Sequence, residues 1–309
     1  MPAAYAHIAV VNVLSEPQRL ERIPGFPTDA IAAILSYFKF CELGAVSPDY
    51  PYLALGDSDA AVWADLMHYE QTVEVIRAGT RQVRTLDRPD RDKALTWLLG
   101  YAAHVATDMA VHPIVKLKVG PYAENKARHR ECEMHQDAYI FPRRLNLGAI
   151  GLAEHLTSGI GQCGRPGHPN QLDTVIETLW RAMLQQAHPD EYRRNPPDLQ
   201  KWRTGFQLIV DKIAEEGNRL LPLARHVAAN LDLVYPGPDQ IKAEYIADLR
   251  LPGGRTAGYD AVFDQAVDHV GQFWAMVSRA ALLGDDQSLA ALNNWNLDIG
   301  CQETLVYWR

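Results

Sequence analysis

Side chains that can bind metal ions recur at four-residue spacing between residues 100 and 139. They form two series, one of His104, Asp108 and His112, and one of His129, Glu133 and Asp137. Residues four apart lie on the same face of an α-helix, with their Cβ atoms about 5–6 Å apart. Two helices that present imidazole and carboxylate groups in this way could bind two or more metal ions between them. The plainer alternative is a pair of helices with polar faces, but six such residues in phase favour a metal site.

The sequence around the first series is apolar on nearly every side. Helical spacing predicts a core stripe made of Leu95, Leu98, Ala102, Val105 and Met109. Most of the residues between them are apolar as well, and a helix that is apolar all round lies inside a protein. We therefore expect Asp108 to be buried, and a buried carboxylate must be paired or coordinate a metal ion.

The composition indicates an all-α protein with a sizeable core. The chain has 309 residues, 47% of them apolar, and clear strand-like alternation is missing. We predict one helical domain over residues 1–309, with the metal-site half in residues 1–145. A Gly-rich loop at 147–171 could cover the site as a lid, and 172–309 complete the bundle. The helices expected in this last part are Val175–Ala187, Trp202–Leu221 and Tyr259–Leu283.

The net charge and the cysteines narrow the class of protein and its cellular compartment further. The net charge of −8 argues mildly against a nonspecific nucleic-acid binder, because phosphate contacts need Lys and Arg. The four cysteines are far apart and form no CxxC, which fits a reducing compartment. The N-terminal sequence has no basic region before its short apolar run, and no apolar run of about 20 residues is present to span a membrane. We expect a cytoplasmic protein without a transmembrane segment.

Two further histidines lie on helices expected before the central pair. Residues 3–14 are expected to form a short apolar helix or turn that carries His7. Ala60–Ala78 is expected to form one helix, with His68 off its apolar stripe. By itself, His7 is better explained as an isolated surface or core histidine, whereas His68 is either solvated or points into a second interior face.

The segment Glu42–Asp59 is expected to be irregular, because Pro48 and Pro51 rule out a helix there. Asp49 lies between these prolines. It is either a turn residue that caps a nearby amide or a rigidly held carboxylate with aromatic walls, which would be Tyr50 and Tyr52.

The C-terminal sequence NNWNLDIGCQETLVYWR is irregular and aromatic, and we expect it to fold back over the bundle. Asn294 and Asn296 are candidates for the border of the pocket. His226 and His269 have no partner in phase, so we leave them out of the site.

The ordered set of motifs over residues 1–140 resembles the zinc-dependent phospholipase C family, which is similar to the S1/P1-type nucleases. The motifs are His7, the segment GAVSPDYPY with Asp49, His68, HxxxDxxxH at 104–112 and HxxxE at 129–133. A weaker echo lies in NWNLDIG near the C-terminus. The resemblance implies a mostly helical fold and a site for two to three zinc ions.

The resemblance also implies a ligand set. Asp49, His68, His104 and Asp108 would hold one zinc ion, and His112, His129 and Glu133 would hold a second. His7 would hold a third, with Asp108 bridging to it. The resemblance assigns no role to Asp137, which could orient a ligand. Secreted family members begin with a Trp whose amino and carbonyl groups bind the third zinc ion. This chain begins with Met, so its third site is incomplete or is completed by other groups near Met1–Tyr5.

These ligands predict hydrolysis of a phosphoester. A catalytic zinc ion keeps a position open for water and lowers the pKa of that water to about 7, and Asp49 could accept its proton. The expected substrate is a small-molecule or lipid phosphoester, with an S1/P1-like nuclease or a phosphatase as the alternative. A non-catalytic, metal-stabilised helical binding protein is the alternative from another class. Iron or manganese would accept the same ligands as zinc.

Overall fold

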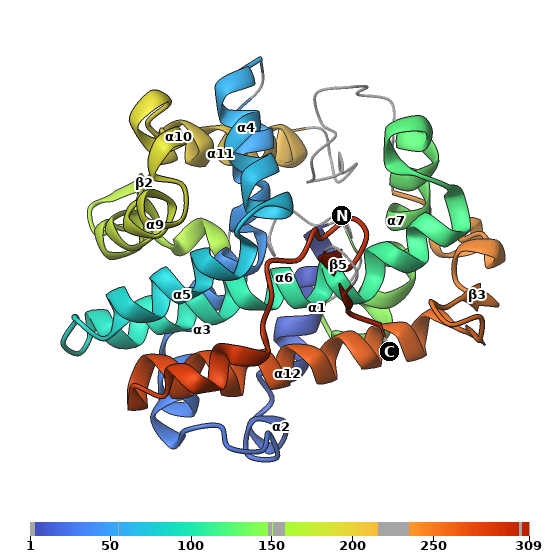
Figure 1. Ribbon diagram of the computed structural model, residues 1–309. Helices are drawn as coiled ribbons and strands as arrows, with labels where there is room; N and C mark the ends of the chain where they lie inside the picture. The colour runs from blue at the N-terminus through green and yellow to red at the C-terminus, as the bar shows by residue number, and fades with distance from the viewer. Residues whose placement is uncertain are drawn as a thin grey trace.

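The computed structural model describes residues 4–54, 56–147, 150, 158–215, 235–302 and 305–308, with the side chains of 209–215 and 305 excepted. The described part is a bundle of helices with three short hairpins (Figure 1). The α-helices are α1 Ala4–Leu14, α2 Pro17–Leu20, α3 Thr28–Val46, α4 Ser58–Tyr69, α5 Thr72–Val83, α6 Asp90–Val119, α7 Tyr122–Arg144, α9 Thr174–Ala187, α10 Pro189–Arg194, α11 Leu199–Glu215 and α12 Tyr259–Leu283. The predicted all-α class is confirmed.

Shorter elements connect these helices. The 3-10 helices are η1 Ser47–Leu53, η2 Ile160–Gln162, η3 Pro238–Gln240, η4 Ala243–Tyr245 and η5 Asp286–Ala291. Antiparallel pairs join β1 Gly164–Arg165 to β2 His168–Leu172, β3 Leu249–Arg250 to β4 Thr256–Ala257, and β5 Cys301–Gln302 to β6 Leu305–Val306.

Helix α6 is the centre of the bundle. It packs most extensively against α3 and α12, and also contacts α1, α5, α7 and α9 (Figure 1). Every residue from 94 to 115 is buried, as its apolar sequence predicts. Trp274 attaches α12 to α6, because its Nε1 donates to the Leu99 carbonyl oxygen at 2.8 Å. The residues in the middle of α6 therefore lie away from solvent on all sides.

Helices α3 and α6 touch at two glycines. A Cβ atom on Gly100 would lie 2.0 Å from the Cys41 carbonyl oxygen, and one on Gly44 would lie 2.1 Å from the Trp97 carbonyl oxygen. Neither backbone can accept a larger residue without moving. The contact places the end of α3, including the Ala45 carbonyl group, against the part of α6 that carries His104.

Two expected boundaries were wrong. The segment 60–78 is not one helix, because the chain leaves α4 at Glu70 in an extended conformation and Gln71 has φ 52° before α5 begins. The segment Glu42–Asp59 is not irregular throughout, since α3 continues to Val46 and η1 follows directly. Proline ends the regular α-helix here, but it fits near the start of a 3-10 helix because the first amides of a helix have no intrahelical acceptor.

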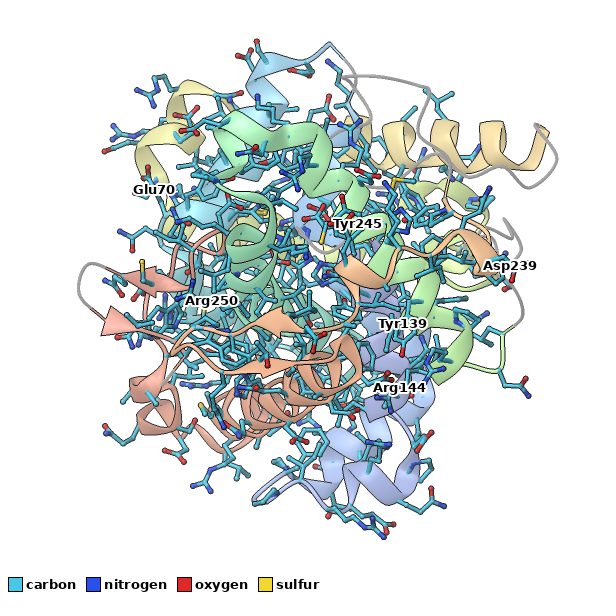
Figure 2. The ribbon with its side chains drawn as sticks, turned by 90° about the vertical axis from the view of Figure 1, so that its right-hand side faces the viewer. Glu70, Tyr139, Arg144, Asp239, Tyr245 and Arg250 are labelled. Atoms are coloured by element: carbon cyan, nitrogen blue, oxygen red, sulfur yellow. The ribbon has the colours of Figure 1, made fainter. Side chains whose placement is uncertain are left out.

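Polar side chains at the end of α7 attach it to the first turns of α12. The hydroxyl of Tyr139 donates to Asp260 at 2.6 Å, and Arg144 pairs with Asp260 and Asp264 at 3.2 and 3.0 Å. Figure 2 shows the labelled Tyr139 and Arg144 near each other on α7. These contacts fix the helix that carries the second metal-competent series.

The segment Thr28–Leu53 is long and apolar enough to cross a membrane by length and composition alone. In the structure, half of its most apolar window is buried, and α3 packs along α6. A core helix accounts for the apolar sequence.

We expect Gly100→Ala to destabilise the protein by about 1–3 kcal/mol, because the added methyl group overpacks the contact with α3. Urea unfolding at equilibrium measures the change. Gly271→Ala in α12 is the matched control, since its Cβ would be 3.7 Å from its nearest neighbour and alanine favours the helix by about 1 kcal/mol. Equal stability of the two variants would contradict the close contact between α3 and α6.

Candidate metal centre

Four buried side chains from three elements converge beside α6. They are Asp49 of η1, His68 of α4, and His104 and Asp108 of α6. Nε2 of His68 lies 3.1 Å from Nε2 of His104, 3.5 Å from Oδ1 of Asp49 and 3.8 Å from Oδ2 of Asp108. Nε2 of His104 lies 3.4 Å from the same Asp108 oxygen. This is the set that the sequence resemblance proposes for one zinc ion.

His68 and His104 turn their Nε2 atoms toward each other. Nδ1 of His68 lies 2.6 Å from the Ala64 carbonyl oxygen, and Nδ1 of His104 lies 2.9 Å from the Ala45 carbonyl oxygen. A carbonyl oxygen only accepts, so these partners assign a proton to Nδ1 in both rings. The two Nε2 atoms then face each other at 3.1 Å, where two lone pairs would repel. A proton on the Nε2 of His104, whose pKa is raised by Asp108 and Asp49 against the effect of burial, relieves this repulsion, and so does a metal ion bound by both nitrogens.

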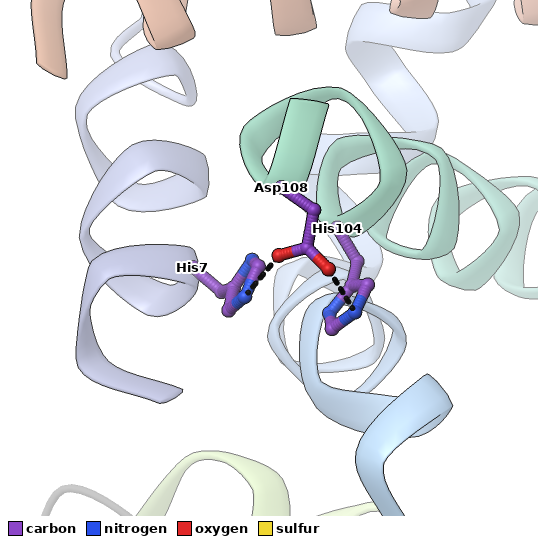
Figure 3. Close-up of side chains that lie close together, drawn as sticks. All are labelled: His7, His104 and Asp108. Atoms are coloured by element: carbon purple, nitrogen blue, oxygen red, sulfur yellow. Dashed lines mark ion pairs between the residues drawn. The ribbon is translucent and has the colours of Figure 1, made fainter. Parts of the chain in front are cut away.

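The carboxylate of Asp108 faces two sides of the centre. Its Oδ2 approaches His104 and His68, whereas its Oδ1 lies 3.2 Å from Nε2 of His7 and 3.9 Å from Nε2 of His112. Figure 3 shows His7 from α1 on one side of this carboxylate and His104 on the other. The two imidazole rings stack with their centroids 4.1 Å apart. This placement lets one carboxylate reach two metal positions.

The second series meets the first across the contact of α6 with α7. Nε2 of His112 lies 3.7 Å from Oε1 of Glu133, and Nδ1 of His129 lies 4.0 Å from the same oxygen. Nε2 of His129 is 2.9 Å from the Gly120 carbonyl oxygen, which assigns its proton to Nε2 and leaves Nδ1 turned toward Glu133. His112, His129 and Glu133 therefore form a second group of donors beside Asp108.

Many polar atoms of the centre have no hydrogen bond within the described part of the chain. They are both ring nitrogens of His7, both oxygens of Asp49, both oxygens of Asp108, Nε2 of His112 and Nδ1 of His129. Buried polar atoms in proteins are nearly always hydrogen-bonded, so each exception requires a physical explanation. Metal coordination explains them together, because it uses the lone pairs that hydrogen bonds would otherwise use.

The spacing of the donors fits zinc. Tetrahedral ligation with bonds of about 2.0–2.2 Å places ligand atoms about 3.3–3.6 Å apart. His68 contacts His104, Asp49 and Asp108, and His104 contacts Asp108, over 3.1–3.8 Å; the donor sets whose atoms all lie within 4.8 Å of one another are Asp49 with His68 and His104, and His7 with His104 and Asp108. Imidazole nitrogen and carboxylate oxygen are also the ligand types that zinc takes from proteins.

Electrostatics keep the carboxylates charged and His7 neutral. Burial alone raises the pKa of Asp49 and of Asp108, but the neighbouring histidines outweigh it, so that the pKa of Asp49 is lowered and that of Asp108 lies well below its usual range. Burial, followed by the neighbouring His104, lowers the pKa of His7 to about 4. At neutral pH these groups are in the protonation states that bind metal ions.

Residues 6–190 match the family described as zinc dependent phospholipase C, which covers more than half of the 309-residue chain. The chain belongs to the zinc-dependent phospholipase C family. This confirms the resemblance drawn from the motifs. Neither a curated protein nor a solved structure matches the chain.

In this family member, Asp137 forms hydrogen bonds with the backbone at the start of α1 rather than with a metal-competent side chain. Its oxygens accept from the backbone N–H groups of Tyr5 at 3.2 Å and Ala6 at 2.9 Å, and from the Tyr235 hydroxyl at 3.1 Å. Asp137 thus caps the first turn of α1, the helix that carries His7. It orients His7 through the backbone.

The two tyrosines beside Asp49 differ in position. The ring of Tyr50 is buried and stacks on Phe206 at 4.7 Å. The ring of Tyr52 lies 5.9 Å from the His68 ring, and its hydroxyl donates to Asp65 at 2.7 Å. Tyr50 therefore forms part of an apolar wall next to Asp49, whereas Tyr52 borders the centre from the side of α4.

The Gly-rich loop reaches the surroundings of the centre at η2. Ile160 lines a small apolar cavity beside Asp49, and Arg203 of α11 holds this segment by donating to the carbonyl oxygens of Ile160 and Gly161. Residues 148–149 and 151–157 of the loop, like His226, lie outside the described residues, so the lid stays a prediction.

One residue of the centre was missed by the sequence analysis. Oδ1 of Asp298, in the C-terminal tail, lies 3.4 Å from Nδ1 of His112. Its only signal in the sequence is the NWNLDIG echo, in which no spacing connects Asp298 to His112. The candidates from the same tail have other contacts, since Asn294 accepts from the amides of Val73 and Glu74 at the start of α5.

We expect Asp137→Asn to gain stability relative to the wild type as the pH rises above about 4, the ordinary pKa of an aspartate. Burial raises the folded-state pKa of Asp137 well above its usual value, against the opposing effect of its three donors. The wild-type carboxyl therefore contributes stability at low pH that is lost as the pH rises through the folded-state pKa. The loss is about 1.4 kcal/mol for each pH unit between the unfolded-state and folded-state pKa values, and the asparagine has no such dependence. Urea unfolding of both metal-free proteins measures the difference, and a pH-independent difference would contradict the raised pKa.

Proposed function

We propose that this protein hydrolyses a phosphodiester in the manner of a phospholipase C, with two to three zinc ions bound beside α6. The proposed ligands are Asp49, His68, His104 and Asp108 for one ion, His112, His129 and Glu133 for a second, and His7 with Asp108 for a third. Membership of a family of phosphoester-hydrolysing enzymes supports the reaction class. The observation that carries the proposal is the convergence of buried imidazole and carboxylate groups, with the donor atoms of Asp49, His68 and His104 within 4.8 Å of one another and those of His7, His104 and Asp108 likewise.

Zinc bound at such a centre supplies Lewis acidity, which polarises a phosphoryl oxygen and acidifies a water molecule. The contribution of the chain is to hold a base beside it. Asp49 is suited to this role because its oxygens have no hydrogen bond in the described structure and its pKa is lowered, so that it is ionised and can accept a proton at neutral pH. Its backbone belongs to the short η1 helix, which limits its movement.

The surroundings of Asp49 also favour chemistry on a charged group. The apolar cavity next to it is lined by Ala4, Ile8, Val46, Asp49, Tyr50, Leu53, Ile160 and Phe206. Apolar walls keep water from screening the charges, and electrostatic interactions in such a setting are stronger than in water. The cavity has a volume of about 10 Å³, no more than a single water molecule occupies, so it keeps solvent away from Asp49 and does not itself hold a substrate.

A purely structural role fits the centre less well. A closed structural zinc site needs four protein ligands, whereas eight metal-competent side chains converge here: His7, Asp49, His68, His104, Asp108, His112, His129 and Glu133. Shared among three ions, these donors leave open coordination positions, which catalysis requires.

We expect Asp49→Asn to lower turnover of a chromogenic phosphodiester by about 10²–10⁴-fold, the usual contribution of a general base. His104→Ala should lose bound metal as well as turnover, because it removes an imidazole ligand, whereas Asp49→Asn keeps a side-chain oxygen that can still bind metal and removes the charge that accepts the proton. Elemental analysis of each purified variant separates the two effects. Asp239→Asn is the control, since Asp239 is an exposed carboxylate of η3 (Figure 2). Wild-type turnover in Asp49→Asn and His104→Ala with unchanged metal content would contradict the proposal.

We expect removal of metal by a chelator to lower the thermal unfolding midpoint, because it leaves buried carboxylates without positive charge. Zinc at about a thousand times its dissociation constant stabilises the folded state by about 4 kcal/mol. Addition of zinc should restore the midpoint, and magnesium should not, since it prefers oxygen ligands. An unchanged midpoint after verified metal removal would contradict the idea that a metal ion compensates the buried carboxylates of the centre.

A further inference from the structure

Four histidines of the centre each have a partner for the ring nitrogen that points outward. In His68, His104 and His129, this nitrogen donates to a backbone carbonyl oxygen. In His112 the outward nitrogen is Nδ1, and the acceptor near it is the carboxylate of Asp298 at 3.4 Å. Among these four rings in the described structure, His112 has the one charged outer partner.

Asp298 is itself held in place. Its Oδ2 accepts from the hydroxyl of Tyr69 in α4 at 2.9 Å, and its backbone N–H donates to Oδ1 of Asn296 at 3.1 Å. These contacts direct Oδ1 toward His112 while Oδ2 is held from the other side. The Asp298 side chain is 21% exposed, so most of its surface is screened from solvent.

The backbone around Asp298 is attached independently of its side chain. The Leu297 N–H donates to the His68 carbonyl oxygen at 2.9 Å, and the Thr72 hydroxyl donates to the Trp295 carbonyl oxygen at 3.0 Å. Beyond Asp298, Trp308 Nε1 donates to the Met109 carbonyl oxygen at 3.1 Å. The tail thus crosses from α4 and α5 to α6, as its red trace shows in Figure 1. Loss of the Asp298 carboxylate should leave the tail in place.

We propose that Asp298 is a positioning residue that sets the tautomer and ring orientation of His112, so that Nε2 faces Asp108 and Glu133. Carboxylates that accept from the outer nitrogen of a metal-ligating histidine act in this way in other metal sites. The inference rests on the proposed function, because it gives His112 the role of a metal ligand. It also extends the centre beyond residues 6–190, the part of the chain that matches the family.

Two geometric observations distinguish a role of Asp298 in positioning His112 from a role in attaching the C-terminal tail. Nε2 of His112 lies between Oδ1 of Asp108 at 3.9 Å and Oε1 of Glu133 at 3.7 Å, so a rotation of the ring would remove it from both. Tyr69 contacts Asp298 on the oxygen opposite His112. Removal of the Tyr69 hydroxyl therefore loosens the carboxylate without deleting the partner of His112.

The test measures zinc binding by four variants of the full chain: Asp298→Ala, Asp298→Asn, Tyr69→Phe and the control Asp239→Asn. Each metal-free protein is titrated with zinc in competition with a chromogenic chelator, and its urea unfolding is measured without metal. We expect Asp298→Ala to bind one zinc equivalent about 10–100-fold more weakly, with the remaining zinc unaffected. Asp298→Asn should fall between Asp298→Ala and the wild type, Tyr69→Phe should lose less than Asp298→Ala, and the control should match the wild type.

The stability of the metal-free variants distinguishes a positioning role of Asp298 from a purely structural one. If Asp298→Asn unfolds with the wild-type midpoint and still loses affinity for one equivalent, the positioning role is supported, even if Asp298→Ala folds poorly. If the wild type binds two to three zinc ions and both Asp298 variants bind them equally well, the inference is wrong and the proposed function stands. If the wild type itself binds no zinc, both are wrong.

Discussion

Asp108 carries a carboxylate in the middle of a helix whose residues 94–115 are all buried, and neither of its oxygens has a hydrogen bond within the described structure. A charge in such a place is tolerated only when opposite charge lies against it. Histidines from α1, α4 and α6 approach the two oxygens from different directions. The arrangement of these helices around α6 therefore brings imidazole groups against the buried charge of Asp108.

Backbone carbonyl groups determine which nitrogen of each imidazole ring faces the centre. The carbonyl groups of Ala45, Ala64 and Gly120 each accept from one imidazole nitrogen and turn the other toward the centre. The Ala45 carbonyl reaches α6 only because two glycines let α3 and α6 come into backbone contact. A steric feature of helix packing thus determines the protonation of a side chain at the centre, and so links the core of the fold to its chemistry.

The second half of the chain takes part in the centre although the family match ends at residue 190. Trp274 of α12 donates to the Leu99 carbonyl group, Trp308 donates to that of Met109, and Asp298 approaches His112. These contacts hold α6 at three points from outside the matched part. The bundle and its tail therefore support the candidate metal centre, whose proposed ligands come from the first half.

The sequence alone determined the helices of the centre and their metal-competent faces, because the four-residue spacing and the apolar surroundings of Asp108 are local features. It did not reveal the break after α4, where an extended residue and a positive φ end the regular pattern. Nor did it reveal that Asp137 caps α1 or that Asp298 faces His112. Those contacts join residues that are far apart in the chain, and no local periodicity encodes such a distance. Which residues could bind metal was a property of the sequence, but which nitrogen faces the centre was decided by tertiary packing, since a ring's tautomer depends on the acceptor that the fold places beside it.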